Sequence, residues 1–378
     1  MVALLVLGST EIEQVISYLD VKEVLSNQAH VFSSIRRSAG FHETTSKASV
    51  GEPLAIQNPH RTTIETKHHN VLFMPARLNH STTVKIVSVP KPNDQLAPPG
   101  IRGTTLVIEE EGGRMKAVVN AESLTGLRTA AGSVLATSLI HDPSQSKPEK
   151  VSIFGGGQQG LYHSLLLSQL YPSITTITFV LTRGDRPSQT TLETIVSLKS
   201  KLAGKNVQVD FSADVEASVK GADIICCCTP STDPLFKDEW VKDGTHLNLV
   251  GSYKPNMQEV PETLIRLCHS QGTLIVDSSA ACSTEAGDLI KASIPSEDCI
   301  ELGDLISDDP DATEVEVKGS LKVIRERFRS TKDDKARNTS LRAISIFKSV
   351  GVGVQDVAIT ALVVEKAIQL GLGQNVNF

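Results

Sequence analysis

Short apolar runs alternate with longer amphipathic stretches between residues 150 and 280. Each run is four to six residues long and is bounded by turn residues or by a helical pattern. Runs of this kind, rich in Val, Ile, Leu and Cys, are typical of strands buried on both faces of a parallel sheet. Six strands with helices between them predict an α/β fold of the doubly wound type. The runs are Val151–Phe154, Ile177–Leu181, Val207–Phe211, Asp223–Cys228, His246–Val250 and Thr273–Asp277.

The first run leads directly into a glycine-rich turn, Gly155-Gly156-Gly157-Gln158-Gln159-Gly160, and then into a helical pattern over Leu161–Leu170. This is the spacing G-x-G-x-x-G in the strand–turn–helix context of a Rossmann dinucleotide-binding domain. Gly155 would form the tight turn, Gly157 would let the backbone approach a pyrophosphate, and Gly160 would let the helix pack closely on the strand. The pattern therefore predicts a dinucleotide cofactor bound at the start of this helix.

The residues after the second run bear on the choice of cofactor. An NAD site usually places Asp or Glu there, but this chain has Thr182 and Arg183, and Asp185 comes slightly later. A guanidinium suits a 2′-phosphate in charge and geometry. We therefore expect NADP(H) in preference to NAD(H). The alternative is that Arg183 and Arg186 are solvated turn residues.

Two cationic side chains stand out in the N-terminal part of the chain. Val84–Val89 alternates like a strand and places Lys85 on the face that is otherwise apolar. The pattern alone leaves open whether Lys85 is an edge residue that reaches water or a buried functional amine. Ala121–Ile140 predicts a long helix rich in small residues, in which Arg128 would be costly unless it pairs with an anion.

The C-terminal region predicts a helix from Val357 to about Leu370, with Asp356 as its N-cap and Gly371 at its end. Before it, the segment 308–340 is dense in charge and indicates a solvated excursion.

Composition narrows the class of partner. The chain has 378 residues, 40% of them hydrophobic, and its net charge of −6 gives no basic surface for nucleic acid or an anionic membrane. No apolar run approaches the length of a membrane span, so we expect a cytoplasmic protein. The six cysteines and ten histidines do not have the spacing of a zinc site, and no metal is expected. Cys226-Cys227-Cys228 lies within a predicted buried strand, where Cys acts as a small hydrophobic residue.

Several blocks of the sequence, taken together, resemble the ornithine cyclodeaminase/μ-crystallin family. The most specific block is Leu124-Thr125-Gly126-Leu127-Arg128-Thr129-Ala130-Ala131, and the matches follow the family's order over roughly residues 55–371. The other blocks are Met74-Pro75-Ala76, Val84–Asn93, the glycine turn, Gly221–Ile224, Thr229–Ser231, Gly244–Asn248, Gly251-Ser252, Glu259, Gly287–Leu289 and Phe347–Asp356.

The resemblance implies two domains. Residues 1–122 and 341–378 would form a discontinuous α+β domain for substrate binding and homodimerisation, and residues 123–340 would form the Rossmann domain. It also implies that Lys85, Arg128 and, on a more divergent segment, Arg61 bind the substrate carboxylate, with Lys85 as a catalytic group. The implied cofactor-binding residues are Gly155, Gly157, Gln158, Gln159, Gly160, Thr182, Arg183, Thr229, Pro230, Ser231, Gly251 and Ser252.

One departure from the family pattern bears on the reaction. Cyclodeaminases carry an Asp in a G-G-D-x-P setting, but here Gly251-Ser252-Tyr253-Lys254-Pro255 places Tyr253 at that position. Without this carboxylate, ammonia loss lacks its expected general base, so Tyr253 becomes a second catalytic candidate. The prediction is an NAD(P)H-dependent reductase of imines or ketimines next to a carboxylate. The alternatives are an amino-acid dehydrogenase, a cyclodeaminase, and a non-catalytic, NADPH-dependent protein that binds a small ligand.

Overall fold

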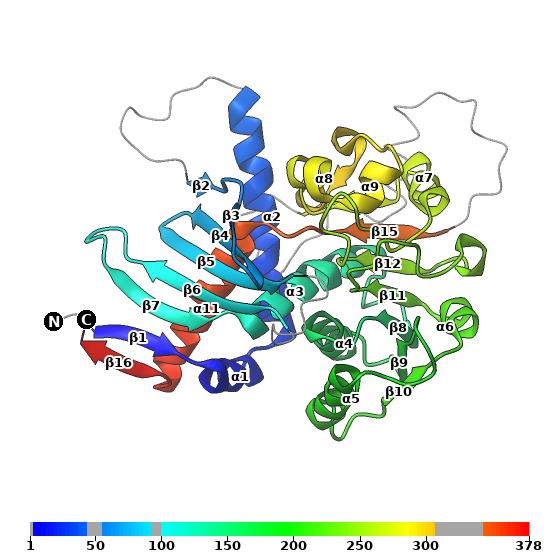
Figure 1. Ribbon diagram of the computed structural model, residues 1–378, viewed down its shortest axis with the longest axis horizontal. Helices are drawn as coiled ribbons and strands as arrows, with labels where there is room; N and C mark the ends of the chain where they lie inside the picture. The colour runs from blue at the N-terminus through cyan, green and yellow to red at the C-terminus, as the bar shows by residue number, and fades with distance from the viewer. Residues whose placement is uncertain (1–2, 44–54, 92–99, 307–342, 378) are drawn as a thin grey trace. The chain divides into compact units, whose positions relative to one another are not determined.

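The computed structural model describes residues 3–43, 55–91, 100–306 and 343–377. The chain forms two compact units (Figure 1). Unit 1 consists of Met1–Arg128 with Val352–Phe378, and unit 2 consists of Thr129–Gly351. Each unit contains its own sheet with helices. The predicted fold class, a Rossmann α/β domain together with a discontinuous second domain, is confirmed.

Unit 2 contains a sheet of eight strands in the order β10-β9-β8-β11-β12-β15-β13-β14, and all the pairings are parallel. All six predicted runs are strands, with bounds that differ from the prediction by at most one residue. The reversal of strand order lies between β8 and β11, as in a doubly wound sheet. The strands are β8 (Lys150–Phe154), β9 (Thr176–Val180), β10 (Gln208–Ser212), β11 (Ile224–Cys227), β12 (His246–Leu249), β13 (Leu274–Val276), β14 (Ile300–Glu301) and β15 (Ser345–Lys348).

Strand β15 belongs to a different unit from the one that the sequence predicts. It pairs with β12 and β13 in the middle of the sheet, whereas the sequence analysis gave residues from 341 onward to the other domain. The structure divides the chain after Arg128 and after Gly351. The reason is that Ser345–Lys348 is fully buried and completes the parallel sheet, although the short run is interrupted by a lysine. The predicted charged excursion, 308–340, lies entirely outside the described residues.

Unit 2 also contains helices and a large apolar core. The core includes Phe154, Cys227, Leu249, Val276 and Ile346 from five different strands. Cys226 and Cys227 are fully buried in β11, as expected of cysteines that act as hydrophobic residues. Within the described residues, the helices that lie wholly in this unit are α4 (Gln158–Leu170), α5 (Gln189–Lys201), α6 (Val215–Gly221), α7 (Glu262–Ser270), α8 (Ser279–Glu285) and α9 (Gly287–Lys291).

Unit 1 contains a second eight-stranded sheet in the order β16-β1-β7-β6-β5-β4-β2, with β3 paired to β4. All its pairings are antiparallel except that of β1 with β7. The predicted strand at Val84–Val89 is the centre of β5. The strands are β1 (Ala3–Leu7), β2 (Ile56–Gln57), β3 (Thr62–Glu65), β4 (His69–Leu78), β5 (Ser81–Pro90), β6 (Arg102–Ile108), β7 (Met115–Asn120) and β16 (Gln374–Asn377).

The C-terminal helix α11 (Gly353–Leu370) packs on β4 and β5 of this sheet and against α2 (Val21–Glu43). Helix α1 (Ser9–Ser17) also contacts α11, and α3 (Glu122–Ile140) follows β7, with the boundary between the units inside it. Helix α11 begins four residues earlier than predicted, so Asp356 is not its N-cap but lies in its first turn. The first residue of the helix, Gly353, packs so closely that a Cβ would lie 3.0 Å from Asn58 Oδ1 and 3.1 Å from Ala76 Cβ.

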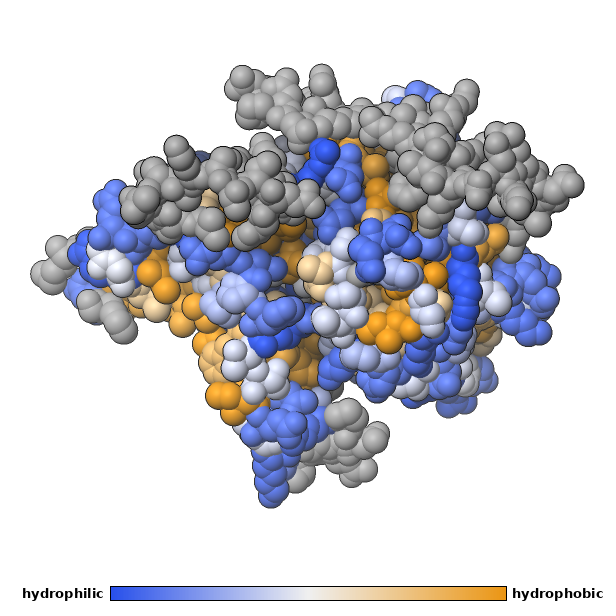
Figure 2. Space-filling view, turned by 90° about the horizontal axis from the view of Figure 1, so that it is seen from above, coloured by the Kyte–Doolittle hydropathy of each residue, from blue (hydrophilic) through white to orange (hydrophobic). Residues whose placement is uncertain are grey.

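The surface is polar with apolar patches (Figure 2). The exposed large apolar side chains of unit 1 are Tyr18, Ile64, Ile101, Ile368, Leu370 and Val376. Among the described residues, no helix has the length and apolar character needed to span a bilayer.

Candidate functional site

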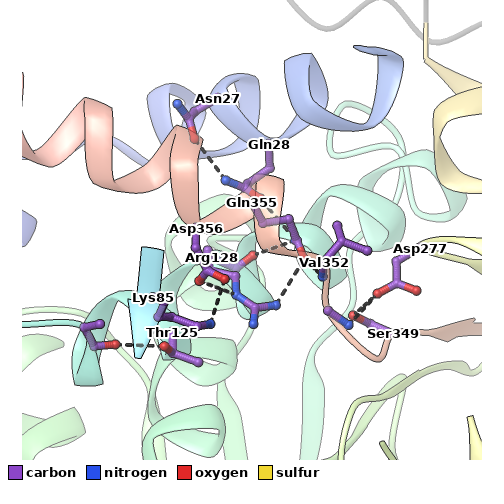
Figure 3. Close-up of polar contacts among 12 residues, drawn as sticks. Asn27, Gln28, Lys85, Thr125, Arg128, Asp277, Ser349, Val352, Gln355 and Asp356 are labelled. Atoms are coloured by element: carbon purple, nitrogen blue, oxygen red, sulfur yellow. Dashed lines mark hydrogen bonds and ion pairs between the residues drawn. The ribbon is translucent and has the colours of Figure 1, made fainter. Parts of the chain in front are cut away.

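Lys85 lies on β5 of unit 1 and is almost completely buried, with 2% of its surface exposed. Its Nζ is 2.7 Å from Oδ2 of Asp356 on helix α11. Arg128 of α3, 6% exposed, also reaches Asp356, with Nε 3.2 Å from Oδ1. Figure 3 shows the two cations converging on this one carboxylate from a strand and a helix. Lys85, Arg128 and Asp356 are called the cation cluster below.

The first turn of α11 fixes the geometry of the cation cluster. The side-chain oxygen of Gln355 accepts hydrogen bonds from Nη1 of Arg128 (3.1 Å) and from the N–H of Val352 (3.2 Å). Its amide nitrogen donates to Oε1 of Gln28, a fully buried residue of α2, at 3.1 Å. These bonds orient the guanidinium before any ligand arrives (Figure 3), and such pre-organisation lowers the free-energy cost of binding.

Burial and neighbouring charges set the protonation of the cluster. Burial lowers the pKa of Lys85 to about 8, against the attraction of Asp356 and with added repulsion from Arg128 and Arg61. Burial alone would raise the pKa of the Asp356 carboxyl, but the charges of Lys85 and Arg128 outweigh burial and hold it below its ordinary value. Near neutral pH both cations and the carboxylate are therefore ionised. The cation cluster therefore carries a net charge of +1.

Arg61 lies just before β3 in the same unit and is partly exposed. It is close enough to Lys85 for its charge to lower the lysine pKa. The structure thus brings together the three predicted carboxylate-binding side chains, Arg61, Lys85 and Arg128, within unit 1. Each of them adds positive charge to one region of the unit.

The glycine turn of unit 2 follows β8 at the carboxyl edge of the sheet. Gly155 has φ of +107°, a conformation that other residues rarely adopt. A Cβ would lie 2.6 Å from the carbonyl oxygen of Cys228 at Gly155, and 2.2 Å from the carbonyl oxygen of Gly155 at Gly160. At Gly157 a Cβ would meet no atom within 4 Å. Gly155 and Gly160 therefore serve the packing of the turn itself, whereas Gly157 keeps open space beside it.

This open space lies at the N-terminus of α4, for which Gly157 is the N-cap. The first N–H groups of a helix have no partners inside the helix, and with the helix dipole they attract phosphate. Gln158 and Gln159 are the first two residues of α4. An open cradle at Gly157 next to such a terminus fits the pyrophosphate of a dinucleotide.

The other predicted cofactor-binding residues also follow strands of this sheet at its carboxyl edge. Thr182 and Arg183 come after β9, and Arg183 is exposed. Thr229, Pro230 and Ser231 come after β11, and Gly251 and Ser252 come after β12. In an open α/β sheet, ligands bind outside this edge, near the reversal of strand order.

Tyr253 also belongs to unit 2, where it is half-buried and packs against the apolar core. Lys254 Nζ lies 5.7 Å from the centre of its ring. The ring therefore has a packing role in the loop after β12, besides any role of its hydroxyl.

Three buried side chains of this architecture were missed as site candidates. The sequence pattern predicts only a capping role for Asp356 and no role for Gln355, and Glu259 stands only among the residues that carry the family resemblance. The sequence does contain a signal for Asp356. A buried Arg128 needs an anion as its partner, so a buried carboxylate is expected elsewhere in the chain.

A parallel sheet with a glycine turn, joined to a discontinuous second unit that buries paired cations, defines a class of Rossmann-type dinucleotide-binding proteins. Within this class, the chain belongs to the ornithine cyclodeaminase/mu-crystallin family, whose model matches residues 21–370. The resemblance found in the sequence is thereby confirmed.

Individual relatives cover most of the chain. It is 27% identical over 351 residues to the ketimine reductase mu-crystallin of Mus musculus, across 92% of this chain and 96% of that protein. It is 28% identical over 302 residues to a Delta(1)-pyrroline-2-carboxylate reductase of Bacillus cereus, across 78% and 80%. Its fold is similar to that of Delta(1)-pyrroline-2-carboxylate reductase from Thermococcus litoralis, solved with NADH and L-proline, with a TM-score of 0.73, 21% identity and coverage of 99% and 100%.

Proposed function

We propose that this protein is an NAD(P)H-dependent reductase of imines and ketimines that carry a carboxylate beside the C=N bond, and that it converts imino acids to amino acids. The observation that carries the proposal is the net charge of +1 in the buried cation cluster, given by Lys85, Arg128 and Asp356. Excess buried charge is costly unless an opposite charge joins it. A substrate carboxylate supplies that charge.

The names of two relatives agree with this chemistry. One is a ketimine reductase and the other a pyrroline-2-carboxylate reductase. A pyrroline-2-carboxylate has its carboxylate on the imine carbon. The cation cluster suits such a substrate, because it offers positive charge for the carboxylate and, in Lys85, a proton donor for the neighbouring nitrogen.

Each cationic side chain has a distinct role in the proposed reaction. Arg61 and Arg128 donate charge-assisted hydrogen bonds to the carboxylate and fix the position of the imine carbon. A nicotinamide cofactor, when bound, would supply the hydride that this carbon accepts. Lys85 donates the proton to the imine nitrogen, so that C=N becomes CH–NH, and the neutral amine takes up a proton from solvent. A lysine with a pKa of about 8 is still protonated at pH 7, and it is a stronger acid than an ordinary lysine.

Tyr253 favours reduction over deamination in this proposal. It stands where cyclodeaminases have an Asp, and a phenol with an ordinary pKa near 10 is a poor general base at neutral pH. We assign it a role in shaping the loop after β12, in keeping with its packing on the core.

We further propose that NADP(H) is the preferred cofactor and that NAD(H) is used less well. The exposed Arg183, three residues after the end of β9, would bind the 2′-phosphate. The cofactor-binding residues are those proposed from the sequence, at the ends of β8, β9, β11 and β12.

We also propose that the protein acts as a cytoplasmic homodimer through unit 1. Ile368 and Leu370 of α11 and Val376 of β16 are exposed apolar residues close together in sequence, and covering such residues favours association. Light scattering coupled to gel filtration tests this; a monomer at micromolar concentration would contradict it.

The proposed reaction is tested by following NADPH absorbance with a panel of cyclic imino acids and of mixtures of 2-oxo acids with amines. We expect oxidation of NADPH, and a loss of about 10²–10⁴-fold in kcat/KM for Lys85→Ala. An amino-acid dehydrogenase would instead turn over only amino acids with NAD(P)⁺, and a cyclodeaminase would release ammonia with no net change in the cofactor. A loss below tenfold for Lys85→Ala, with cofactor binding intact, would remove Lys85 as the proton donor.

A further inference from the structure

A second buried carboxylate, Glu259, lies in unit 2 outside the cation cluster. Its Oε1 accepts hydrogen bonds from the N–H (2.7 Å) and the hydroxyl (2.9 Å) of Thr229, and its Oε2 accepts one from the N–H of Gly251 (2.8 Å). Thr229 follows β11 and Gly251 follows β12. One side chain, fully buried, therefore ties together the loops at the ends of two neighbouring strands.

The backbone around Glu259 is itself held in place. Oδ1 of Asp288 accepts the N–H of Glu259 at 2.8 Å, and the N–H of Asp288 donates to Oγ of Ser252 at 3.1 Å. The N–H of Gln258 donates to the carbonyl oxygen of Ser231 at 2.8 Å. The two loops and the Glu259 segment are thus bound to one another at several points.

The two loops also approach each other without spare room. A Cβ at Gly251 would lie 2.1 Å from the carbonyl oxygen of Thr229 and 2.5 Å from Oε1 of Glu259. A change in the orientation of the carboxylate must therefore move one loop relative to the other.

The charges around Glu259 make its carboxylate costly to keep in this position. Burial raises its pKa to about 7, the nearby Asp288 adds to the rise, and Lys348 of β15 opposes it. Lys348 Nζ lies 3.6 Å from Oδ2 of Asp288, and both side chains are fully buried. The thiols of Cys227 and Cys228 also face this group, and burial raises their pKa values, so they stay uncharged. Costly buried charges of this kind concentrate at functional sites.

The position of the two loops in the sheet indicates which half of a dinucleotide they would contact. The sheet reverses its strand order between β8 and β11. The half that begins with β8 carries the glycine turn and Arg183, which belong to the pyrophosphate and the adenine-side ribose, so β11 and β12 belong to the half that receives the nicotinamide nucleotide. We propose that Glu259 is a positioning residue for the nicotinamide half of the dinucleotide, because its carboxylate holds the loops after β11 and β12 in the conformation that binds this half. The inference rests on the dinucleotide binding proposed above.

The variant Glu259→Gln tests this with little change of shape. Its amide oxygen can still accept from Thr229, but its NH₂ group faces the N–H of Gly251, where two donors repel. Glu262→Gln, three residues along the chain on a partly exposed side chain paired with Arg266, is the matched control. Calorimetry would give the Kd of NADPH and of adenosine 2′,5′-bisphosphate, which lacks the nicotinamide half.

We expect Glu259→Gln to raise the Kd of NADPH about tenfold or more, the effect of losing a hydrogen bond to a charged group. The Kd of adenosine 2′,5′-bisphosphate should change less than about twofold, and Glu262→Gln should change neither value. An unchanged Kd of NADPH, or an equal weakening of both ligands, would overturn the inference. If the unaltered protein bound neither ligand, the proposed function itself would be wrong.

A pH series on the unaltered protein gives the second readout. Protonation of Glu259 places a hydrogen atom on a carboxyl oxygen that otherwise accepts a hydrogen bond from a loop N–H. The protonated side chain therefore resembles that of the Gln variant. In this series adenosine 2′-monophosphate replaces the bisphosphate, because the 5′-phosphate monoester of the bisphosphate titrates at about pH 6 and has no titrating counterpart in NADPH. The ratio of the Kd of NADPH to that of the monophosphate, in which the 2′-phosphate common to both ligands cancels, should therefore rise severalfold from pH 8 to pH 6. It should stay flat in Glu259→Gln. A flat ratio in the unaltered protein contradicts the inference even if the variant does not fold.

Discussion

Replacing Asp356 by Asn removes the carboxylate that Lys85 and Arg128 share, with almost no change in volume. Lys85 Nζ lies 2.7 Å from that carboxylate, and the lysine has a pKa of about 8 because Asp356 opposes the effect of burial. Without this attraction, burial and the repulsion from Arg128 and Arg61 act alone. The pKa of Lys85 must then fall further.

The size of this fall follows from the distance. An opposite charge at such a range shifts a pKa by about 1–3 units, so in Asp356→Asn the pKa of Lys85 should be about 5–7. At pH 7.5 roughly three quarters of the lysine is protonated in the unaltered protein, given a pKa of about 8. In the variant, about 3% is protonated if the shift is 2 units. If the ammonium is the proton donor, kcat/KM at this pH should fall about tenfold or more.

The assay is the pH dependence of kcat/KM for a cyclic imino acid, measured by NADPH absorbance at saturating cofactor from pH 5 to 9. The alkaline limb should move toward acid by about 1–3 units in Asp356→Asn, with much of the activity recovered at low pH. Asp356→Glu keeps the charge and should leave the limb close to its original place. Protonation of the substrate contributes equally in all three proteins.

An alkaline limb that stays in place in Asp356→Asn would refute the assignment of Lys85 as the titrating group. Stability gives an independent check of the same charges. Removing the carboxylate leaves Arg128 buried without its opposite charge and makes Lys85 give up its proton, so the free energy of unfolding should fall by about 3–5 kcal/mol, measured by chemical denaturation at pH 7. A change below about 1 kcal/mol would mean that the cations do not depend on Asp356.

Four further substitutions test the nucleotide-binding unit. Gly157→Ala should leave the melting temperature within a few degrees, because its Cβ meets no atom within 4 Å, yet it should raise the Kd of NADPH at least tenfold. Gly160→Ala should also destabilise the fold, because its Cβ would lie 2.2 Å from a carbonyl oxygen. Equal melting temperatures of the two variants would contradict this distinction. Arg183→Gln should raise the KM for NADPH about tenfold or more and leave that for NADH within about twofold, and equal changes would show that Arg183 does not bind the 2′-phosphate. Tyr253→Phe should change kcat less than about threefold, because the ring packs against the core, and a loss of tenfold or more would make the hydroxyl a proton donor.

The sheet of unit 2 could be predicted because its strands carry a local signal. Each of the six predicted runs is apolar throughout and bounded by turn residues, so its assignment needs no knowledge of its neighbours. β15 was missed because Lys348 interrupts its apolar run. That lysine is buried only because Asp288, 60 residues earlier in the chain, provides a carboxylate 3.6 Å away. A pattern within one segment cannot supply a partner at that distance in sequence.

The same reasoning explains why the cation cluster could be predicted only in part. Lys85 and Arg128 violate the apolar or small-residue pattern around them, and such violations mark functional sites. Asp356 violates nothing, because an acidic residue is favourable in the first turn of any helix, so local reasoning gave it a role in capping. Only the folded chain, in which α11 packs on β5 and Arg128 of α3 reaches the first turn of α11, shows that this carboxylate lies within 3.2 Å of both cations. A residue that satisfies a local rule can thus be the one on which the buried site depends.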